Sequence, residues 1–557
     1  MSARALHPLL VLGLDGATFD VIDPLARAGR LPTLGAWRGR GVATPLASTT
    51  PPMSFPAWST FATGLAPGGH GLFDFTQKVA GAYRIRFANA THRRGETLWG
   101  RASRAGGRVL VLGVPATFPP EPVRGLLVSG FDAPVSTGTD ARQASDPALY
   151  RRIAARAGPW MRPDLDEGAH AQGWHEQAVA VLLRRIERKT AFALAALDEL
   201  RRAEGARPDL VVVVFSESDT VAHHFWRDHD PGSPRHDPTA SEARRGAVAA
   251  VYARLDAACA ELRAAYGEDA PCVVLSDHGC GGSARRVVHL GRRLAEAGLL
   301  RRSRPGGAGL DRFARGTRDL ALRTLPPRAA QAIFRRARPA AARLESQVRF
   351  GGIDWRRTAA FTEDVNTQPG IWINLCHREA QGCVAASDTE RVLRDAIDCL
   401  LDWKLPDGGP VVARALPREE LHLGPLALRA PDVVVELAED AGYPLVAVPT
   451  PWSDPAAPSV RLLGAGELAG GRGRGTNGTH RRHGIWIADA PGPAAWARLP
   501  EPARLVSAAP ALAAAMGLAW EPCNGSAAGM ESGRRLDYTP DEEEAVANRL
   551  RALGYLE

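Results

Sequence analysis

The chain has 557 residues, of which 45% are hydrophobic and 23% are charged, and its formal net charge is +8. A chain of this length can bury a large core without disulfide or metal staples, and these fractions exclude disordered, collagen-like and coiled-coil proteins. A positive charge is typical of proteins that bind nucleic acids or membrane surfaces. Nearly all of it is arginine, because the only lysines are Lys78, Lys189 and Lys404. So uneven a ratio indicates a compositional bias, and we expect no nucleic-acid partner.

The cysteines predict a reducing compartment. There are seven, at positions 259, 272, 280, 376, 383, 399 and 523, and none forms a C-x-x-C pair. This pattern argues against a disulfide framework and against a cysteine-based zinc site. The apolar run Leu9–Leu14 is too short for the core of a signal peptide, and no stretch approaches 18 uninterrupted apolar residues. We therefore expect a soluble cytoplasmic protein.

In chain order, short apolar runs rich in β-branched residues alternate with long amphipathic segments. The segments 176–202 and 241–266 carry apolar residues at helical spacing opposite Arg and Glu. Strands that alternate with helices of this length predict an α/β fold with a mostly parallel sheet covered on both faces. The buried strands are expected at Leu9–Leu14, 109–114, Leu210–Phe215, Cys272–Leu275, Val433–Leu437 and 484–488.

Carboxylates or imidazoles stand at four of the predicted strand ends. Asp15 follows the first strand, Asp219 the third and the pair Asp277-His278 the fourth, whereas His480 stands beside the last. In an open parallel sheet, ligands gather outside the carboxyl ends of the strands. Taken singly, each Asp is more typical of a helix N-cap or a turn than of a ligand.

Asp219 and His223 are four residues apart, which places both on one face of a helix, as a pair of metal ligands requires. So common a spacing also suits a simple surface pair. The adjacent residues Asp277 and His278 can both point into a crevice, or they can merely end a strand. Carboxylate oxygens and imidazole nitrogens are the ligands that a zinc site uses when it has no cysteine.

Ser54 is the candidate nucleophile. Pro56 presets the helical φ in a first turn, and we expect Ser54 at the N-cap. A hydroxyl there faces the positive end of the helix dipole, which favours an alkoxide and binds phosphate; capping alone is the equal alternative. Together with the strand-end residues, Ser54 completes two sets of three ligands and one shared nucleophile. That is the composition of a two-metal site for displacement at phosphorus.

These motifs lie at 13–16, 54–64, 67–71, 218–223, 275–279 and 478–480. On them the chain resembles the alkaline phosphatase superfamily, and within it the type I phosphodiesterase/nucleotide pyrophosphatase branch. The resemblance implies an alkaline phosphatase-like three-layer sandwich with a mostly parallel central sheet and a helical or irregular insertion. It also implies two Zn²⁺ ions, with Mn²⁺ as a possible replacement, and a phosphoseryl intermediate on Ser54, which bridges the ions. The implied ligands are Asp219, His223 and His480 for one ion and Asp15, Asp277 and His278 for the other.

Two positions depart from the patterns of relatives. Phosphodiesterases usually carry Thr as the nucleophile and Asn three residues later, whereas this chain has Ser54 and Ala57. The phosphoryl contact of that Asn is therefore missing, and we expect Arg481 or a backbone N–H to replace it. Sulfatases of the superfamily need Arg four residues after the nucleophile, where this chain has Trp58, so we expect no sulfatase activity. Trp58, Phe73 and Trp226 are expected to line a leaving-group pocket, with ordinary packing as the more common alternative for each, and Arg481 is expected in the substrate pocket.

The sequence thus predicts a phosphoric ester hydrolase of the phosphodiesterase or nucleotide pyrophosphatase type. Its expected substrate is a phosphorylated small molecule such as a nucleotide or a nucleotide-sugar. Two alternatives stay open. One is a phosphomutase resembling the cofactor-independent phosphoglycerate mutases, which also use Ser and two metal ions, typically manganese. The other is a non-catalytic descendant that binds a phosphorylated ligand.

Most of the positive charge lies in one segment. Residues 301–349 contain thirteen arginines and three acidic residues, a net charge of +10, which leaves −2 for the rest of the chain. We expect this segment to cap the site or to make a peripheral contact with an anionic partner or membrane surface. The predicted divisions are 1–290 for the first part of the catalytic core, 291–350 for a basic helical insertion or cap, 351–465 for the second part of the core and cap, and 466–557 for completion of the core with the last metal ligand and a C-terminal helix.

Overall fold

The structure of the protein is a computed structural model. The structure describes residues 6–134, 141–160, 174–303, 341–365, 367–452, 454, 456–464, 467–468, 477–490, 495–521 and 537–552. Among these residues, no helix has both the length and the apolar character needed to cross a bilayer.

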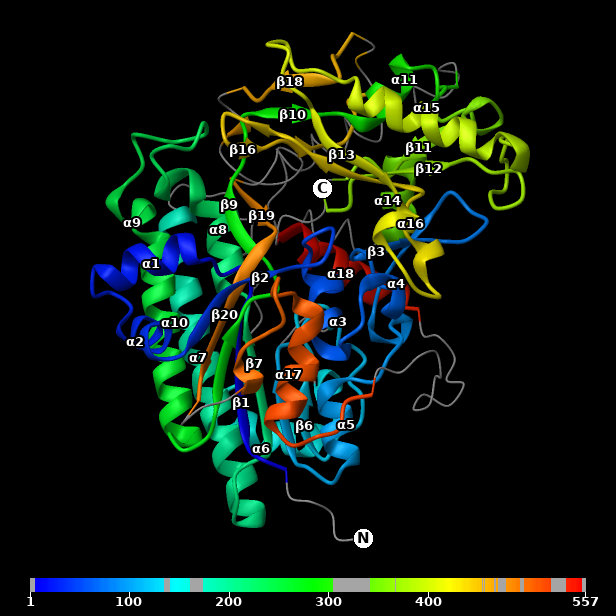
Figure 1. Ribbon diagram of the computed structural model, residues 1–557. Coiled ribbons are helices and arrows are strands. Elements are labelled where there is room, and N and C mark those ends of the chain that lie inside the picture. Colours follow the sequence, from blue (N-terminus) through cyan, green and yellow to red (C-terminus); the bar gives the residue numbers. More distant parts are fainter. Residues whose placement is uncertain are drawn as a thin grey trace.

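A seven-stranded sheet forms the centre of the larger part of the molecule (Figure 1). Its strand order is β2-β20-β8-β1-β7-β5-β6. β20 runs antiparallel to both of its neighbours, β2 and β8, whereas the other strand pairs of the described sheet are parallel, so the predicted mostly parallel sheet is confirmed. The strands are β1 (Leu9–Leu14), β2 (Val42–Ala47), β5 (Val109–Leu112), β6 (Gly125–Val128), β7 (Leu210–Phe215), β8 (Cys272–Leu275) and β20 (His483–Asp489).

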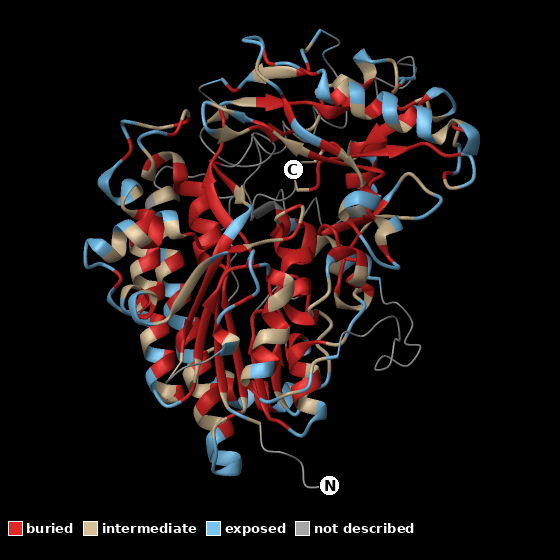
Figure 2. Cartoon of the chain, viewed as in Figure 1, coloured by how far each residue is buried: buried red, intermediate tan, exposed pale blue. Residues whose placement is uncertain are grey.

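Both faces of this sheet are covered, because successive residues of a strand point to opposite faces. In β1, Leu10 and Leu12 pack into one hydrophobic cluster, whereas Leu9 and Val11 pack into another. Helices on opposite sides of the sheet close the two clusters, and the strands between them are buried (Figure 2). The molecule is therefore the predicted three-layer sandwich. The helices are α7 (Trp174–Glu204), α8 (Glu217–His229) and α10 (Ala247–Tyr266) on one side and α3 (Ser54–Thr63) and α17 (Ala508–Ala515) on the other.

The long helices agree with the sequence except at one glycine. The segment predicted at 176–202 is α7, with two more residues at each end. The segment predicted at 241–266 is divided at Gly246 into α9 (Glu242–Arg245) and α10. Glycine is a poor residue for a helix interior, and this accounts for the break. The C-terminal helix is α18 (Pro540–Ala552).

A second body, which we call the cap, lies over the carboxyl ends of the central strands (Figure 1). It contains a four-stranded antiparallel sheet and a three-stranded sheet around a hydrophobic cluster of its own. The run Val433–Leu437 forms the predicted strand, but this strand belongs to the cap and not to the central sheet. A short apolar run does not reveal which sheet it joins. The strands are β11 (Ala360–Thr362), β12 (Gly370–Ile373), β14 (Val433–Leu437) and β13 (Val412–Pro417), then β17 (Val446–Ala447), β10 (Arg286–Val288) and β18 (Val460–Leu462).

The basic insertion predicted at 291–350 lies mostly outside the described residues, since 304–340 are not among them. Its described flanks are α11 (Leu290–Glu296) and α14 (Ala341–Phe350). Arg349 is buried and donates to Glu345 and Glu363. At least one of the thirteen arginines therefore neutralises internal acids, and the contact with an anionic surface stays a prediction.

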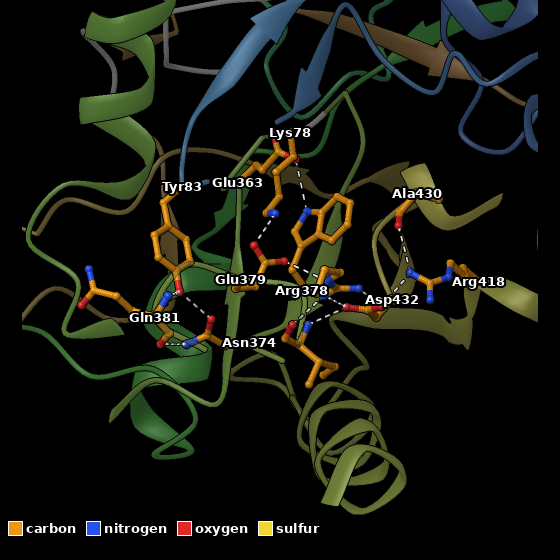
Figure 3. A network of polar contacts seen from close by, with 12 residues as sticks. Lys78, Tyr83, Glu363, Asn374, Arg378, Glu379, Gln381, Arg418, Ala430 and Asp432 are labelled. Atoms are coloured by element: carbon orange, nitrogen blue, oxygen red, sulfur yellow. Dashed lines mark hydrogen bonds and ion pairs between the residues drawn. The ribbon is translucent and has the colours of Figure 1, made fainter. Parts of the chain in front are cut away.

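A buried polar network fastens the hairpin of β3 (Thr76–Lys78) and β4 (Ile85–Phe87) to the cap (Figure 3). Lys78 Nζ donates to Glu379 Oε2 at 2.6 Å, and the two side chains are 3% and 0% exposed. Arg378 extends the network by donating to both carboxylate oxygens of Asp432. A buried charge is costly unless it is paired, so each member of the Lys78–Glu379 pair needs the other.

We expect Glu379→Ala to lower the free energy of unfolding by about 3–5 kcal/mol, because the Lys78 ammonium group stays buried without its partner. Urea denaturation followed by tryptophan fluorescence measures the change. The control is Asp388→Ala, which removes a partner of the exposed Arg391 and should leave the transition where it is, since exposed ion pairs contribute little. Wild-type stability in Glu379→Ala would contradict this account of the network.

Candidate active site

Three adjacent parallel strands bring the predicted acids together. β1 lies between β7 and β8, so the residues that follow these strands share one edge of the sheet. Asp15 follows β1, Asp219 lies in the first turn of α8 after β7, and Asp277 follows β8. The three side chains are buried. The sequence prediction that strand ends gather these carboxylates therefore agrees with the structure.

The imidazoles come from α8 and from a small ribbon that the sequence did not predict. His223 lies on α8 one turn after Asp219. The ribbon pairs β9 (Gly279–Gly282), which directly follows His278, with β19 (Gly478–Arg481) in antiparallel register. This register places His480 opposite Cys280. The ribbon thus brings a residue from the C-terminal part of the chain to the carboxylates.

Asp219, His223 and His480 form one set of ligand atoms. His223 Nε2 lies 3.0 Å from His480 Nε2, and these nitrogens lie 3.2 and 3.5 Å from Asp219 Oδ1. Their Nδ1 atoms face the carbonyl oxygens of Gly478 and Pro52 at 2.9 and 2.7 Å. A carbonyl oxygen only accepts, so both Nδ1 atoms are donors. In neutral rings, the two Nε2 lone pairs then face each other and a carboxylate, an arrangement that a cation between them stabilises.

Asp15, Asp277 and His278 form a second set. His278 Nε2 lies 3.3 Å from Asp277 Oδ2 and 3.6 Å from Asp15 Oδ1. The other two carboxylate oxygens are bound, because Trp58 Nε1 donates to Asp15 and the Gly16 N–H donates to Asp277. Asp15 Oδ1 and Asp277 Oδ2 are buried, and neither meets a hydrogen-bond donor within the described ranges. The ligand atoms of each set lie within 4.8 Å of one another, and both sets suit a divalent cation.

Burial and mutual repulsion perturb these groups. Burial, aided by the charge of Asp219, raises the pKa of Asp277 to about 7. Burial and the charges of Asp277 and Asp219 raise the pKa of Asp15 well above its ordinary value, and burial lowers the pKa of His278. Asp219 differs: when His223 and His480 are protonated, their positive charge and their hydrogen bonds overcome the effect of its burial and hold its pKa well below the ordinary value.

Ser54 lies at the start of α3 and contacts the second set. It is the first helical residue and not the N-cap as we had predicted; the N-cap is Met53, whose side chain makes no capping bond. Ser54 Oγ lies 3.3 Å from His278 Nε2, and the side chain is fully buried. At this end of a helix, backbone N–H groups and the dipole favour negative charge. The hydroxyl thus lies at a helix N-terminus and in contact with one candidate ligand, His278.

Trp58 and Phe73 have almost no exposed surface, whereas a residue that lines a pocket needs some. Trp58 is 0% exposed and lies in the hydrophobic cluster between α3 and the sheet, so the predicted pocket role for it is wrong. Its Nε1 donates to Asp15 Oδ2 at 3.2 Å, which makes Trp58 a positioning residue. Phe73 is 3% exposed and packs edge-on against His422, with ring centroids 4.9 Å apart.

Trp226 and Arg481 line one cavity of about 410 Å³ between the core and the cap. Asp230 braces its wall by accepting from Trp226 Nε1 and from the Tyr443 hydroxyl. Arg481 follows His480 on β19, and neighbours on a strand point to opposite faces. Arg481 therefore points away from the side chain of His480, and it donates to the Gly282 carbonyl. Arg481 thus lines the cavity, and the structure does not bring it into the cluster of candidate ligands.

Cys280 is the site residue that the sequence reasoning missed. It is fully buried on β9, and its Sγ lies 3.3 Å from Asp219 Oδ1. Gly16, with φ +67°, permits this close packing, because a Cβ there would lie 2.8 Å from Cys280 Sγ and 2.9 Å from Asp219 Oδ1. A signal was present in the sequence, because Cys280 lies only two residues after His278. The absence of a C-x-x-C pair led us to disregard it.

Trp58→Phe should weaken metal binding about 10- to 100-fold, because Asp15 loses the N–H donor that orients it. Trp486→Phe is the matched control: Trp486 is buried in the same cluster, and its Nε1 donates to the Ala497 carbonyl. Competition with a chromogenic chelator measures both affinities. An equal loss in the two variants would show that core packing, and not the hydrogen bond to Asp15, controls the affinity.

Metal-free protein should lose stability as the pH rises from about 4 to about 7. The pKa of Asp277 is about 7 in the folded state against an ordinary value of 3.8. The folded state therefore binds more protons in this window, and the stabilisation present below the ordinary pKa is lost as the pH rises through the folded one. Asp277→Asn should flatten this dependence. Thermal unfolding in excess chelator tests it, and parallel pH profiles for variant and wild type would contradict it.

Comparisons with known proteins place this site in a family. The family model for type I phosphodiesterase / nucleotide pyrophosphatase matches residues 9–441, whereas no match was found among curated proteins. One similar solved structure is phosphonoacetate hydrolase from Sinorhizobium meliloti 1021 in complex with phosphonoacetate, at 18% identity and a TM-score of 0.47, covering 92% of this chain and 96% of that chain. Another is murine ectonucleotide pyrophosphatase / phosphodiesterase 5, at 12% identity and a TM-score of 0.45, covering 93% of this chain and 98% of that chain. Because the family model spans well over half of the sequence, this chain belongs to the type I phosphodiesterase/nucleotide pyrophosphatase family of phosphoric ester hydrolases, as its motifs predicted.

Proposed function

We propose that this chain is a two-metal phosphohydrolase that cleaves phosphodiester or pyrophosphate bonds with Ser54 as the nucleophile. The observation that carries the proposal is that two sets of buried acceptor atoms adjoin, through the stacked rings of His278 and His480, and that one of them contacts a serine hydroxyl. The Nε2 atoms of His223 and His480 face each other at 3.0 Å beside a carboxylate. The second set, with two carboxylate oxygens that meet no donor in the described part of the chain, includes His278, which contacts Ser54 Oγ.

The residues of the chain have separable roles in this reaction. Ser54 Oγ releases its proton to solvent and forms a bond to phosphorus. The bond from phosphorus to the leaving oxygen breaks with its electron pair going to that oxygen, which takes up a proton from solvent. The N-terminal amides of α3 bind the phosphoryl oxygens. Water then attacks the phosphoseryl group, and Ser54 regains its proton as phosphate or a phosphomonoester leaves. Two bound divalent cations would lower the pKa of the serine hydroxyl and neutralise charge on the attacking and leaving oxygens.

The donor atoms favour zinc for the first set. Asp219, His223 and His480 offer two nitrogens and one oxygen, a common zinc combination. The second set offers two carboxylates and one imidazole, and such an oxygen-rich site also accepts manganese. We therefore propose two Zn²⁺ ions, with Mn²⁺ as the possible replacement.

Two rival functions use the same residues. A phosphomutase resembling the cofactor-independent phosphoglycerate mutases would also need Ser54 and both ligand sets, but the family model that matches is that of phosphodiesterases. A non-catalytic phospho-ligand-binding protein would have no need of a serine hydroxyl placed 3.3 Å from a candidate metal ligand. Manganese in the purified protein, with phosphoryl transfer but no net hydrolysis, would favour the phosphomutase.

The proposed substrate is a phosphorylated small molecule, such as a nucleotide or a nucleotide-sugar. The cavity beside β9 supports this choice, because Trp226 and Tyr443 on its wall can pack against a planar or cyclic leaving group. We also propose a cytoplasmic location. It is supported by the six cysteines of the described ranges, all of which are free thiols.

Ser54→Ala should reduce hydrolysis at least about a thousandfold, because it removes the nucleophile. The assay compares bis-p-nitrophenyl phosphate, a diester, with p-nitrophenyl phosphate, a monoester, after the metal-free protein has been loaded with zinc. Ser59→Ala is the matched control, since Ser59 is a second fully buried serine of α3 and lies outside both ligand sets. If metal-loaded wild type hydrolyses neither ester, or if Ser54→Ala keeps full activity, the proposed function is wrong.

A further inference from the structure

Cys280 lies where the two candidate ligand sets meet. Its Sγ is 3.3 Å from Asp219 Oδ1, and Asp219 belongs to the first set. The ligand atoms of Asp219, His278 and Cys280 also lie within 4.8 Å of one another, as do those of each of the other two sets. The three residues thus form a third group that shares Asp219 with one set and His278 with the other.

The surroundings of this group indicate a cation and not only a buried thiol. Asp277 Oδ2 and Asp15 Oδ1 lie 3.3 and 3.6 Å from His278 Nε2, and neither oxygen meets a hydrogen-bond donor among the described residues. His278 Nδ1 donates to the Gly279 carbonyl, so Nε2 is directed inward. The whole group is buried. His278 Nε2 therefore lies beside two carboxylate oxygens that meet no donor among the described residues and beside the Ser54 hydroxyl.

The register of the ribbon holds the cysteine in this position. Cys280 pairs with His480 across β9 and β19, so the strand that carries a ligand of the first set also fixes the thiol. The backbone of Gly16 packs closely against the same two residues, because a Cβ at this position would contact both Cys280 Sγ and Asp219 Oδ1. The thiol is thus held against Asp219 from two directions.

We propose that Cys280 is a metal ligand, and that Asp219, His278 and Cys280 form a thiolate-containing site for a thiophilic divalent cation. On binding, the Sγ–H proton leaves to solvent and Sγ forms a bond to the cation, with no change in oxidation state. One sulfur, one nitrogen and one oxygen suit Zn²⁺, Co²⁺ or Cd²⁺ and not Mg²⁺ or Mn²⁺. Because the site shares a residue with each set, a cation in it competes with the two-metal arrangement. The inference rests on the metal-binding part of the proposed function and not on the serine chemistry.

Cobalt titration of the metal-free, full-length protein tests the site without any measurement of activity. We expect a near-ultraviolet sulfur-to-cobalt charge-transfer band in the wild type. The band should be lost in Cys280→Ser and Cys280→Ala but kept in Cys272→Ser, which alters a buried cysteine on β8 outside the three sets. X-ray absorption of zinc-loaded protein should show a Zn–S distance of about 2.3 Å. Cys280→Ser should weaken Cd²⁺ binding about 10-fold or more and leave Mn²⁺ binding unchanged.

The outcomes separate this inference from the proposed function. Cobalt d–d bands without a charge-transfer band in the wild type would show that Cys280 only donates a hydrogen bond to Asp219; they would overturn the inference and leave the two-metal proposal intact. Absence of bound cobalt would overturn both. Absence of the band in the wild type overturns the inference even if a cysteine variant fails to fold. A wild-type band supports it when the band is lost in folded Cys280→Ser or Cys280→Ala, and a band that persists in folded Cys280→Ala would also overturn it.

Discussion

The repulsion between buried acceptor atoms is the constraint on which the rest of this structure depends. Carboxylates and inward-facing imidazole nitrogens lie close together and are mostly buried, and like groups repel more strongly there than in bulk water. They stay in place because other groups hold them from behind: the Trp58 indole and the Gly16 amide bind the carboxylates, and three backbone carbonyls bind the imidazoles. The sheet, α3 and the ribbon together form the rigid frame that these holding groups require.

The sequence was sufficient to predict the part of the site that follows from strand order. Asp15, Asp219 and Asp277 each follow a run of buried apolar residues, and the carboxyl ends of parallel strands meet at one edge of the sheet. The i, i+4 spacing likewise placed His223 beside Asp219, as α8 shows. These predictions needed only local periodicity and one rule of sheet topology. Local periodicity and strand order do not predict the direction in which each side chain points.

The remaining features depend on contacts that local patterns do not encode. The segment Gly279–Gly282 has almost no side chains with strand preference, and its pairing with β19 becomes visible only in three dimensions. Trp58 has the size and position of a pocket residue, yet close packing against Gly13 buries it. Val433–Leu437 has the composition of a central strand but joins the cap. In each case the deciding information is the identity of a distant neighbour.

The position of β20 has a consequence for how the molecule is assembled. This strand comes late in the chain, yet it lies inside the central sheet and joins β2 to β8. Until residue 489 has been synthesised, β2 has no described neighbour through which to enter the sheet. The ligands after β1 and β8 are complete by residue 278, whereas the set that needs His480 is completed only as β19 and β20 arrive. During translation, the two halves of the candidate metal centre therefore become available at different times, separated by the synthesis of the entire cap.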